Sequence, residues 1–294
     1  MQKDVGNIDA SLATPRAVQQ LISEHGFVFR RSLGQNFLVD GNVLRNIVRA
    51  AQITRKDTVI EIGAGIGTLT RALASTAERV LAIEIDARLH PILQETVERY
   101  GNVEVLAHDA LKLDWQVLWD DYDLKQAKLV ANLPYYITSP LLVNVLTEEL
   151  PWDNLTVMMQ REVAERLTAK RGTKSYGTLT VLASYYSDVE ICQIVPPTVF
   201  MPQPDVDSAV VRFTMRPYTL EVHDPALLWR VIKASFAQRR KTLGNNLAAA
   251  LSGILTKAEL ESILQALGID SRRRAETLSL QEFVVLVNRL EDCI

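Results

Sequence analysis

Short apolar runs alternate with amphipathic segments between residues 58 and 167. The runs are typical of buried strands, and apolar residues recur at helical spacing in the segments between them. The pattern predicts strands at 58–62, 80–83, 103–107, 128–131 and 155–159, and helices that end near 74, span 87–99 and 140–150, and begin near 161. Strands that alternate with helices form a mostly parallel sheet with helices on both faces. The expected fold class is therefore α/β, with a Rossmann-like sheet.

The first fifty residues carry helix signals of their own. Thr14 is expected to cap a helix that has Pro15 at its first position and an apolar stripe behind it. Residues 32–38 are expected to form a loop, and a second amphipathic helix follows Asp40. The pattern thus predicts a helical N-terminal extension, residues 1–50, ahead of the sheet.

The alternation stops after the fifth strand and its helix. Two further strands, at 189–195 and 208–215, are joined by a proline-rich connection and are expected to form an antiparallel pair at the sheet edge. Beyond residue 217 the pattern is helical. Capping boxes at Thr256 with Glu259 and at Ser279 with Glu282 support this, and Gly268 fits a helix C-terminus. We expect a boundary within 216–222, so that residues 1–218 form the sheet domain and residues 219–294 a small all-helical domain.

Residues 63–67, Gly-Ala-Gly-Ile-Gly, follow the first strand directly and open a helix. Glycines at such a turn allow the backbone to approach a nucleotide-like ligand closely. A dinucleotide fingerprint has its last glycine one position later, where this chain has Thr68, and the tighter spacing suits S-adenosylmethionine. Glu84 ends the second strand, where a carboxylate accepts ribose hydroxyls, and Asp109 follows the third, where one accepts from an adenine amino group. No nicotinamide signature accompanies the loop, so hydride transfer has little support.

Asn132, Leu133, Pro134 and Tyr135 come directly after the fourth strand. Open α/β sheets bind their ligands at the carboxyl ends of strands. The four residues combine an amide that accepts hydrogen bonds, a rigid proline and an aromatic ring for stacking. Together they suit a planar base with an exocyclic amino group, so the sequence predicts an enzyme that acts on a nucleobase.

Composition excludes several classes of protein. Hydrophobic residues make up 48% and charged residues 23% of the chain, as in soluble globular proteins. No apolar run approaches the ~20 residues of a membrane span, and residues 1–13 lack the apolar stretch of a signal peptide. Cys192 and Cys293 lie far apart, so we expect neither a disulfide framework nor a zinc site, and a reducing, cytoplasmic compartment. Nothing in the pattern requires an obligate dimer, so we expect a monomer.

The net charge of −3 disfavours a simple nucleic-acid-binding domain, but basic residues are clustered. One cluster comprises Lys170, Arg171 and Lys174, and another Arg239, Arg240 and Lys241. Ordinary solvated surface is the simpler explanation for any one such cluster taken alone. In an enzyme that acts on RNA, the same clusters are candidate contacts to the phosphate backbone.

Several motifs stand in a characteristic order along the chain. They are GQNFL at 34–38, EIGAGIGTLT at 61–70, EID at 84–86, DA at 109–110, ANLPYYI at 131–137, VF at 199–200, SAVV at 208–211 and FAQRRKTL at 236–243. In this order and spacing the chain resembles the KsgA (RsmA) family of 16S ribosomal RNA adenine N6,N6-dimethyltransferases. The resemblance covers residues from about 30 to 250; the first thirty residues and the last forty carry little of it.

The resemblance implies a sheet domain that binds S-adenosyl-L-methionine, no metal, and a helical domain that binds RNA or the ribosome. It implies cofactor contacts at Asn36, Leu38, Gly63, Gly65, Glu84, Asp109 and Asn132. The implied reaction dimethylates N6 of two adjacent adenines in the 3′-terminal hairpin loop of small-subunit ribosomal RNA, within a nearly assembled 30S (pre-30S) subunit.

Residues 132–135 suit methyl transfer to adenine N6. The lone pair of adenine N6 is delocalised into the ring, and acceptors for both N6 hydrogens favour a pyramidal, nucleophilic nitrogen. The Asn132 side-chain carbonyl and the Leu133 backbone carbonyl are the expected acceptors, and Pro134 fixes the geometry of the latter. Tyr135 and Phe200 are expected to stack on the two faces of an extruded base.

Three other functions are consistent with parts of the sequence. Large-subunit (23S) ribosomal RNA methylases of the antibiotic-resistance type share the motif order, but usually have Asn-Ile-Pro-Tyr where this chain has Leu133 and are more basic. DNA adenine methylases more often carry Pro-Pro-Tyr at this place. A non-catalytic assembly factor that keeps the fold is the third, and the intact set Gly63, Glu84, Asp109 and Asn132 disfavours it.

Overall fold

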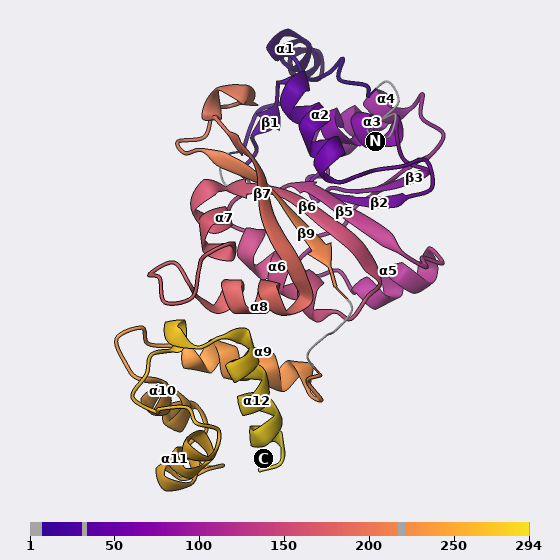
Figure 1. The fold of residues 1–294 in the computed structure, drawn as a ribbon. Helices are drawn as coiled ribbons and strands as arrows, with labels where there is room; N and C mark the ends of the chain where they lie inside the picture. Colours follow the sequence, from indigo (N-terminus) through magenta and orange to yellow (C-terminus); the bar gives the residue numbers. More distant parts are fainter. Residues whose placement is uncertain (1–7, 31–33, 217–220, 294) are drawn as a thin grey trace, which may run out of the picture. The chain divides into compact units, whose positions relative to one another are not determined.

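The computed structural model describes residues 8–30, 34–216 and 221–293. Within these ranges a seven-stranded sheet has the order β4-β3-β2-β5-β6-β9-β7 (Figure 1). The strands are β2 (Thr58–Ile62), β3 (Arg79–Ile83), β4 (Val103–Leu106), β5 (Ala127–Asn132), β6 (Trp152–Gln160), β7 (Ser187–Val195) and β9 (Ser208–Met215). Pairing is parallel from β4 through β6 and antiparallel between β6 and β9. The predicted α/β sheet, mostly parallel with an antiparallel strand near one edge, is confirmed.

The register of the parallel strands brings the candidate residues to one edge. Ile62 of β2 lies opposite Ile83 of β3 and opposite Ala131 of β5. The next residue along each strand is therefore Gly63, Glu84 or Asn132. These three come from separate segments of the sequence yet leave the sheet at the same level. This alignment is what makes a shared site possible.

Helices cover the sheet. They are α1 (Pro15–Glu24), α2 (Gly41–Ala50), α3 (Thr68–Ala74), α4 (His90–Val97), α5 (Trp115–Asp121), α6 (Thr138–Thr147) and α7 (Arg161–Leu167). Helices α1, α2 and α5 begin at residues whose side chains cap them. Thr14 caps α1 with Pro15 at its first position, and Asp40 caps α2, as predicted. One hydrophobic core cluster joins the apolar stripes of α2 and α3 to inward-facing residues of five strands, Val59, Val80, Val130, Met158 and Val210. Helices α2 and α3 therefore bury one face of the sheet.

Some elements differ from the expectation. Phe37–Leu38 forms strand β1, paired antiparallel with β8 (Phe200–Met201), although 32–38 was expected to be a loop; residues 32 and 33 lie outside the described ranges. Helix α5 was not predicted, because its acidic surface residues conceal the three that it buries, Trp115, Leu118 and Trp119. At the sheet edge, β9 lies between β6 and β7.

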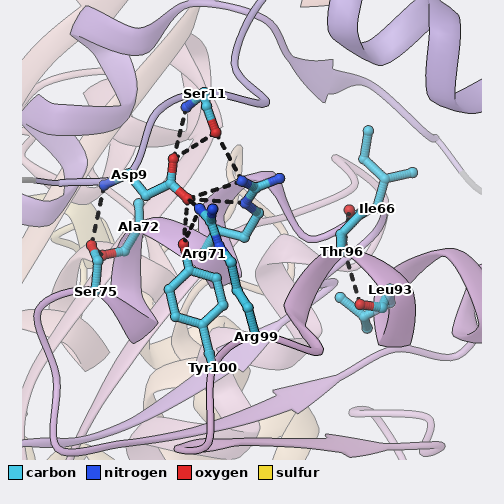
Figure 2. A network of polar contacts seen from close by, with 10 residues as sticks. All are labelled: Asp9, Ser11, Ile66, Arg71, Ala72, Ser75, Leu93, Thr96, Arg99 and Tyr100. Atoms are coloured by element: carbon cyan, nitrogen blue, oxygen red, sulfur yellow. Dashed lines mark hydrogen bonds and ion pairs between the residues drawn. The ribbon is translucent and has the colours of Figure 1, made fainter.

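The N-terminal extension is fastened to the sheet domain through Asp9, whose side chain is 14% exposed (Figure 2). Its carboxylate accepts from Arg71 of α3 at 3.0 and 3.1 Å and also from Arg99 and the Tyr100 hydroxyl. Its backbone amide donates to Ser75 at 3.2 Å. Although burial opposes it, hydrogen bonds from Tyr100 and Ser11 and the charge of Arg71 hold the pKa of Asp9 below its ordinary value. This network holds the segment before α1 against α3, the helix that begins directly after the glycine loop.

A second compact unit comprises Glu165–Val189 and Arg216–Ile294. It contains α8 (Thr178–Tyr186), α9 (Pro225–Ser235), α10 (Leu243–Ala250), α11 (Lys257–Ala266) and α12 (Leu280–Glu291). Both predicted capping boxes are present, at the starts of α11 and α12, and Gly268 follows α11 with a φ of 70°. The unit takes in residues 165–189, which the sequence placed in the first domain, because α8 packs against α9 and α12. The expected boundary at 216–222 overlaps residues 217–220, outside the described ranges.

Over the described residues, none of the helices combines the length and the apolar character that a membrane span needs.

Candidate active site

A pocket opens at the carboxyl edge of the parallel strands. Nearly all the predicted cofactor and catalytic residues line it: Asn36, Gly63, Gly65, Glu84, Asp109, Asn132, Leu133, Pro134, Tyr135 and Phe200. They come from the ends of β2, β3, β4 and β5, the loop before β1, and β8. Chain topology rather than sequence proximity thus assembles the site.

The glycine loop between β2 and α3 is tightly anchored. The amides of Gly63 and Ala64 donate to the Ile83 carbonyl at 2.9 and 3.2 Å, and Thr96 of α4 donates to the Ile66 carbonyl at 3.0 Å (Figure 2). Gly67 has a φ of 87°, and a Cβ there would lie only 2.4 Å from the Thr96 hydroxyl oxygen. Only glycine fits this position, so the backbone shape of the loop is fixed before any ligand binds.

Glu84 has its carboxylate held in place by backbone amides. Oε2 accepts from Gly65 and Oε1 from Asp86, each at 2.8 Å, and His90 bonds the Glu84 carbonyl at 2.8 Å. The side chain is 6% exposed, and this burial raises the pKa of Glu84 against the lowering effect of the two amides. Each carboxylate oxygen has a second lone pair, so the group keeps acceptors for a diol.

Asn132 has a defined amide orientation. Its Nδ2 donates to the Asn36 carbonyl at 3.1 Å, while Asn36 in turn donates to the Gly34 carbonyl at 3.1 Å. Because the nitrogen is engaged in this way, the side-chain oxygen is the atom that faces a ligand as an acceptor. The Leu133 amide donates to the Met158 carbonyl of β6 at 3.2 Å, which fixes the peptide that follows the strand.

The two expected stacking rings differ in their surroundings. Tyr135 is half-buried, and its hydroxyl lies 2.9 Å from the Ser208 hydroxyl at the start of β9. Burial raises the pKa of Tyr135. Phe200 lines the pocket but is only 3% exposed and belongs to the core cluster between α2 and the sheet. In this conformation Tyr135 offers the larger surface to a base.

Leu38 does not line the main pocket. It is 3% exposed and borders a small adjoining cavity behind the glycine loop, together with Glu61. Glu61 is 1% exposed, and its burial raises the pKa to about 8. A neutral acid therefore lies directly behind the loop at neutral pH.

Among the residues that line the pocket without a role predicted from sequence, three are described by their contacts or their exposure. Gln35 links two segments: its side chain donates to the Asp86 carboxylate at 2.8 Å and accepts from the Arg30 amide at 2.9 Å. Ile85 and Tyr136 line the pocket and are 54% and 58% exposed. The motifs GQNFL, EID and NLPYY contain all three, but no pattern in the sequence indicates which motif residues face a cavity.

The geometry fits S-adenosylmethionine. The buried Glu84 carboxylate has acceptor oxygens that suit a ribose diol, and Gly63 and Gly65 of the turn line the same pocket. An apolar surface at Ile85 lies next to Glu84 for a ring. Asp109 lines the same pocket, with Oδ1 accepting from the Leu111 amide at 3.0 Å.

Comparison with known proteins decides the family. A profile of the family described as "Ribosomal RNA adenine dimethylase" matches residues 26–292. The chain belongs to this family. Among curated relatives, it is 50% identical over 283 residues to "Ribosomal RNA small subunit methyltransferase A" of Geobacillus thermodenitrificans, covering 95% of this chain and 97% of that protein. The protein of the same name from Bacillus cereus is also 50% identical, with the same coverage.

Solved structures agree with this membership. A dimethyladenosine transferase from Plasmodium falciparum superposes with a TM-score of 0.73 at 26% identity, covering 87% of this chain and 98% of that one. The 23S rRNA methyltransferase ErmE superposes with a TM-score of 0.63 at 26% identity, covering 87% and 100%. Family membership confirms the prediction of a ribosomal RNA methyltransferase that uses S-adenosylmethionine, and the curated relatives favour the small-subunit function over the large-subunit alternative.

The basic residues predicted to contact RNA lie in the second unit. Lys170, Arg171, Arg239, Arg240 and Lys241 are all exposed. Arg239 donates to the Lys174 carbonyl, so the two basic segments lie side by side. Two clusters that are far apart in sequence thus share one surface.

Proposed function

We propose that this chain transfers methyl groups from S-adenosylmethionine to N6 of two adjacent adenines in the 3′-terminal hairpin loop of small-subunit ribosomal RNA. The observation that carries the proposal is the Asn132 amide. Its nitrogen donates to the Asn36 carbonyl at 3.1 Å, which leaves its oxygen as the acceptor that the side chain offers, and the residue lines the pocket that Glu84 and Asp109 also line. A fixed carbonyl oxygen in that place is an acceptor for the amino group of a base.

The protein contributes preorganised acceptors. The Asn132 side-chain oxygen and the Leu133 carbonyl each accept a hydrogen bond from one N6 hydrogen. These two hydrogen bonds favour a pyramidal nitrogen, in which the lone pair is localised on N6 instead of delocalised into the ring. The Asn36 carbonyl holds the Asn132 amide at 3.1 Å, and the Leu133 amide, one peptide before the Leu133 carbonyl, donates to Met158 at 3.2 Å, so the backbone that carries both acceptors is restrained before the base arrives. Pro134 limits the backbone freedom of the second acceptor.

When bound, S-adenosylmethionine supplies a methyl group on a sulfonium, which is a good leaving group. Glu84 would hold its ribose and Asp109 its adenine, which would bring the methyl donor into the pocket that Asn132 also lines. In the proposed transfer N6 would gain the methyl carbon as its bond to the cofactor sulfur breaks, the electron pair would stay on sulfur as a neutral thioether, and N6 would lose one proton to solvent. The proposal therefore requires neither a metal nor a nucleophilic side chain.

The target adenine must leave its stack to reach Asn132. Unstacking costs a few kcal/mol of free energy, and stacking of the base on an aromatic ring offsets part of that cost. Tyr135, which lines the pocket and is half-buried, is the proposed platform on one face of the base. Phe200 is the proposed second platform, and because it is only 3% exposed in this conformation, it would have to turn outward or be met at its edge.

The proposed partner is the RNA of a nearly assembled 30S subunit, bound by a monomer in the cytoplasm, where such subunits form. Arg239, Arg240 and Lys241, with Lys170 and Arg171, form the proposed backbone contacts. Each neutralised phosphate releases counterions, so Arg240→Ala should reduce the slope of log affinity against log salt by about one. Lys257→Ala, an exposed cation of α11, is the control and should leave the slope unchanged.

Methyl transfer from labelled cofactor tests the function. Unmethylated small subunits, naked small-subunit RNA, large-subunit RNA and DNA are compared in parallel. The proposal predicts label in small-subunit RNA at adjacent adenines, as N6,N6-dimethyladenine. Label confined to large-subunit RNA or to DNA would overturn it.

A further inference from the structure

The pocket mouth carries an aromatic ring that the proposed chemistry does not use. Tyr136 is 58% exposed, more than any other aromatic residue that lines the pocket in the described ranges. Its neighbour Tyr135 is half-buried, and Phe200 is 3% exposed. Single exposed apolar side chains are common on protein surfaces, so it is the place of this ring in the lining of the pocket, and not its exposure alone, that suggests a contact with a ligand.

The backbone around Tyr136 is fixed. The Ile137 amide donates to the Pro134 carbonyl at 3.2 Å and closes a turn, and α6 begins at Thr138. From the other side, Gly34 packs against this turn with a φ of 59°. A Cβ on Gly34 would lie 3.2 Å from the Pro134 Cβ and 3.7 Å from Tyr136 Cδ1. Tyr136 is therefore presented by a rigid turn rather than by a loose loop.

Tyr135 and Tyr136 have different neighbours. The Tyr135 hydroxyl is bonded to Ser208 of β9, whereas Tyr136 lies against the Gly34 segment that precedes β1. Both follow Asn132 within four positions and both line the pocket, so both rings are near the residue proposed to accept the base amino group. Two rings with separate supports suit two bases rather than two faces of one.

An extruded adenine leaves its neighbour without a stacking partner. We propose that Tyr136 stacks on the nucleobase adjacent to the target adenine, and so helps to select an unpaired pair of bases. The proposal rests on the proposed function, because the neighbouring base is part of that substrate. Stacking on an aromatic ring is worth enough to affect affinity and is tolerant of base identity.

The first experiment measures kinetics on unmethylated small subunits. Tyr136→Ala should raise KM for the subunit about tenfold, with kcat within about twofold and the dissociation constant for S-adenosylmethionine unchanged. Tyr136→Phe keeps the ring and should behave as wild type. Val117→Ala, an exposed apolar residue of α5 outside the pocket, is the control for a surface truncation. An unchanged KM in Tyr136→Ala would overturn the proposal.

The second experiment locates the contact in hairpin-loop RNA. 2-Aminopurine replaces one of the two adjacent adenines; it has no N6 amino group, so the remaining adenine is the only target and the fluorescent base is the neighbour. Stacking should quench its fluorescence on binding to wild type and to Tyr136→Phe, but not to Tyr136→Ala. An abasic neighbour should weaken wild-type binding and abolish the difference between wild type and Tyr136→Ala.

The outcomes separate the two proposals. If Tyr136→Ala still weakens binding to RNA with an abasic neighbour, the ring contacts the target or another part of the subunit, and the stacking proposal is wrong. If wild type methylates no small-subunit RNA, the proposed function fails and the stacking proposal fails with it. If wild type transfers methyl groups normally and all variants quench the 2-aminopurine fluorescence equally, the stacking proposal is wrong while the proposed function stands.

Discussion

Replacing Glu61 by glutamine should stabilise the protein, and increasingly so as the pH rises. Glu61 lies in β2, one residue before the end of the strand, and is 1% exposed. Burial raises its pKa from 4.5 to about 8; the Thr70 hydroxyl opposes the rise and the charge of Glu84 adds to it. In the unfolded chain the same carboxyl ionises near its ordinary value, about 4.3.

The magnitude follows from the difference between the two pKa values. Each unit corresponds to about 1.4 kcal/mol, so a pKa that moves from 4.5 to about 8 corresponds to about 5 kcal/mol at pH 8 and above. Relaxation of the fold and entry of water reduce such penalties, so we expect about 2–5 kcal/mol. The folded state holds the proton while the unfolded state loses it. The free energy of unfolding of the wild type therefore falls as pH rises from about 4.5 to about 8, and this contribution is constant above.

Urea unfolding at pH 5, 7 and 8.5, followed by circular dichroism, measures the effect. Glu61→Gln should differ little from wild type at pH 5 and be the more stable protein by about 2–5 kcal/mol at pH 8.5. Glu98→Gln removes an exposed carboxyl at the end of α4 and should stay within about 0.5 kcal/mol of wild type at each pH. A difference between Glu61→Gln and wild type that does not grow with pH would refute the reasoning, since it would mean that Glu61 is not neutral in the folded state.

Two further predictions concern carboxylates with defined partners. Asp9→Asn should lower the free energy of unfolding at pH 7 by about 2 kcal/mol, because charged hydrogen bonds from Arg71 and Arg99 are lost. The pKa of Asp9 is lowered in the folded state. The contribution of Asp9 to stability is therefore present above about pH 4 and is lost as the pH falls through the pKa of the folded state. Urea unfolding across that range checks it, and equal stabilities at pH 7 would count against the network. Glu84→Gln should raise the dissociation constant for S-adenosylmethionine at least tenfold by calorimetry. Because burial raises the pKa of Glu84, wild-type affinity should weaken as the pH falls toward that pKa while the variant stays flat, and parallel profiles would exclude a charged Glu84 as the ribose acceptor.

Local and periodic signals account for what the sequence predicted well. The strand at 58–62, the glycine turn and the following helix are contiguous, so their pattern is complete within a short window. Glu84, Asp109 and Asn132 can be grouped by their positions after successive strands, because parallel strands carry their carboxyl ends to one edge. The family resemblance added Asn36 and the RNA substrate, neither of which any spacing indicates.

Long-range pairing accounts for what could not be predicted. The Asp9 network joins residues 62 and 90 positions apart, and β1 pairs with β8 from a distant part of the chain. Residues 165–189 belong to the second unit through packing of α8 on α9, a contact that periodicity does not encode. The exposure of Tyr136 and the bridging role of Gln35 likewise depend on which loops meet at the pocket.

The central claim is that Asn132 supplies the acceptor that activates adenine N6 in small-subunit RNA. Mass-spectrometric mapping of methylated small subunits, with cofactor binding measured on the same preparations, tests it most directly. Wild type and Asn245→Ala, an exposed asparagine of α10, should each yield two adjacent dimethyladenines. Asn132→Ala should bind S-adenosylmethionine within about threefold of wild type and lose methyl transfer by about a hundredfold or more. Full transfer by Asn132→Ala, or dimethyladenine found only in large-subunit RNA, would contradict the account.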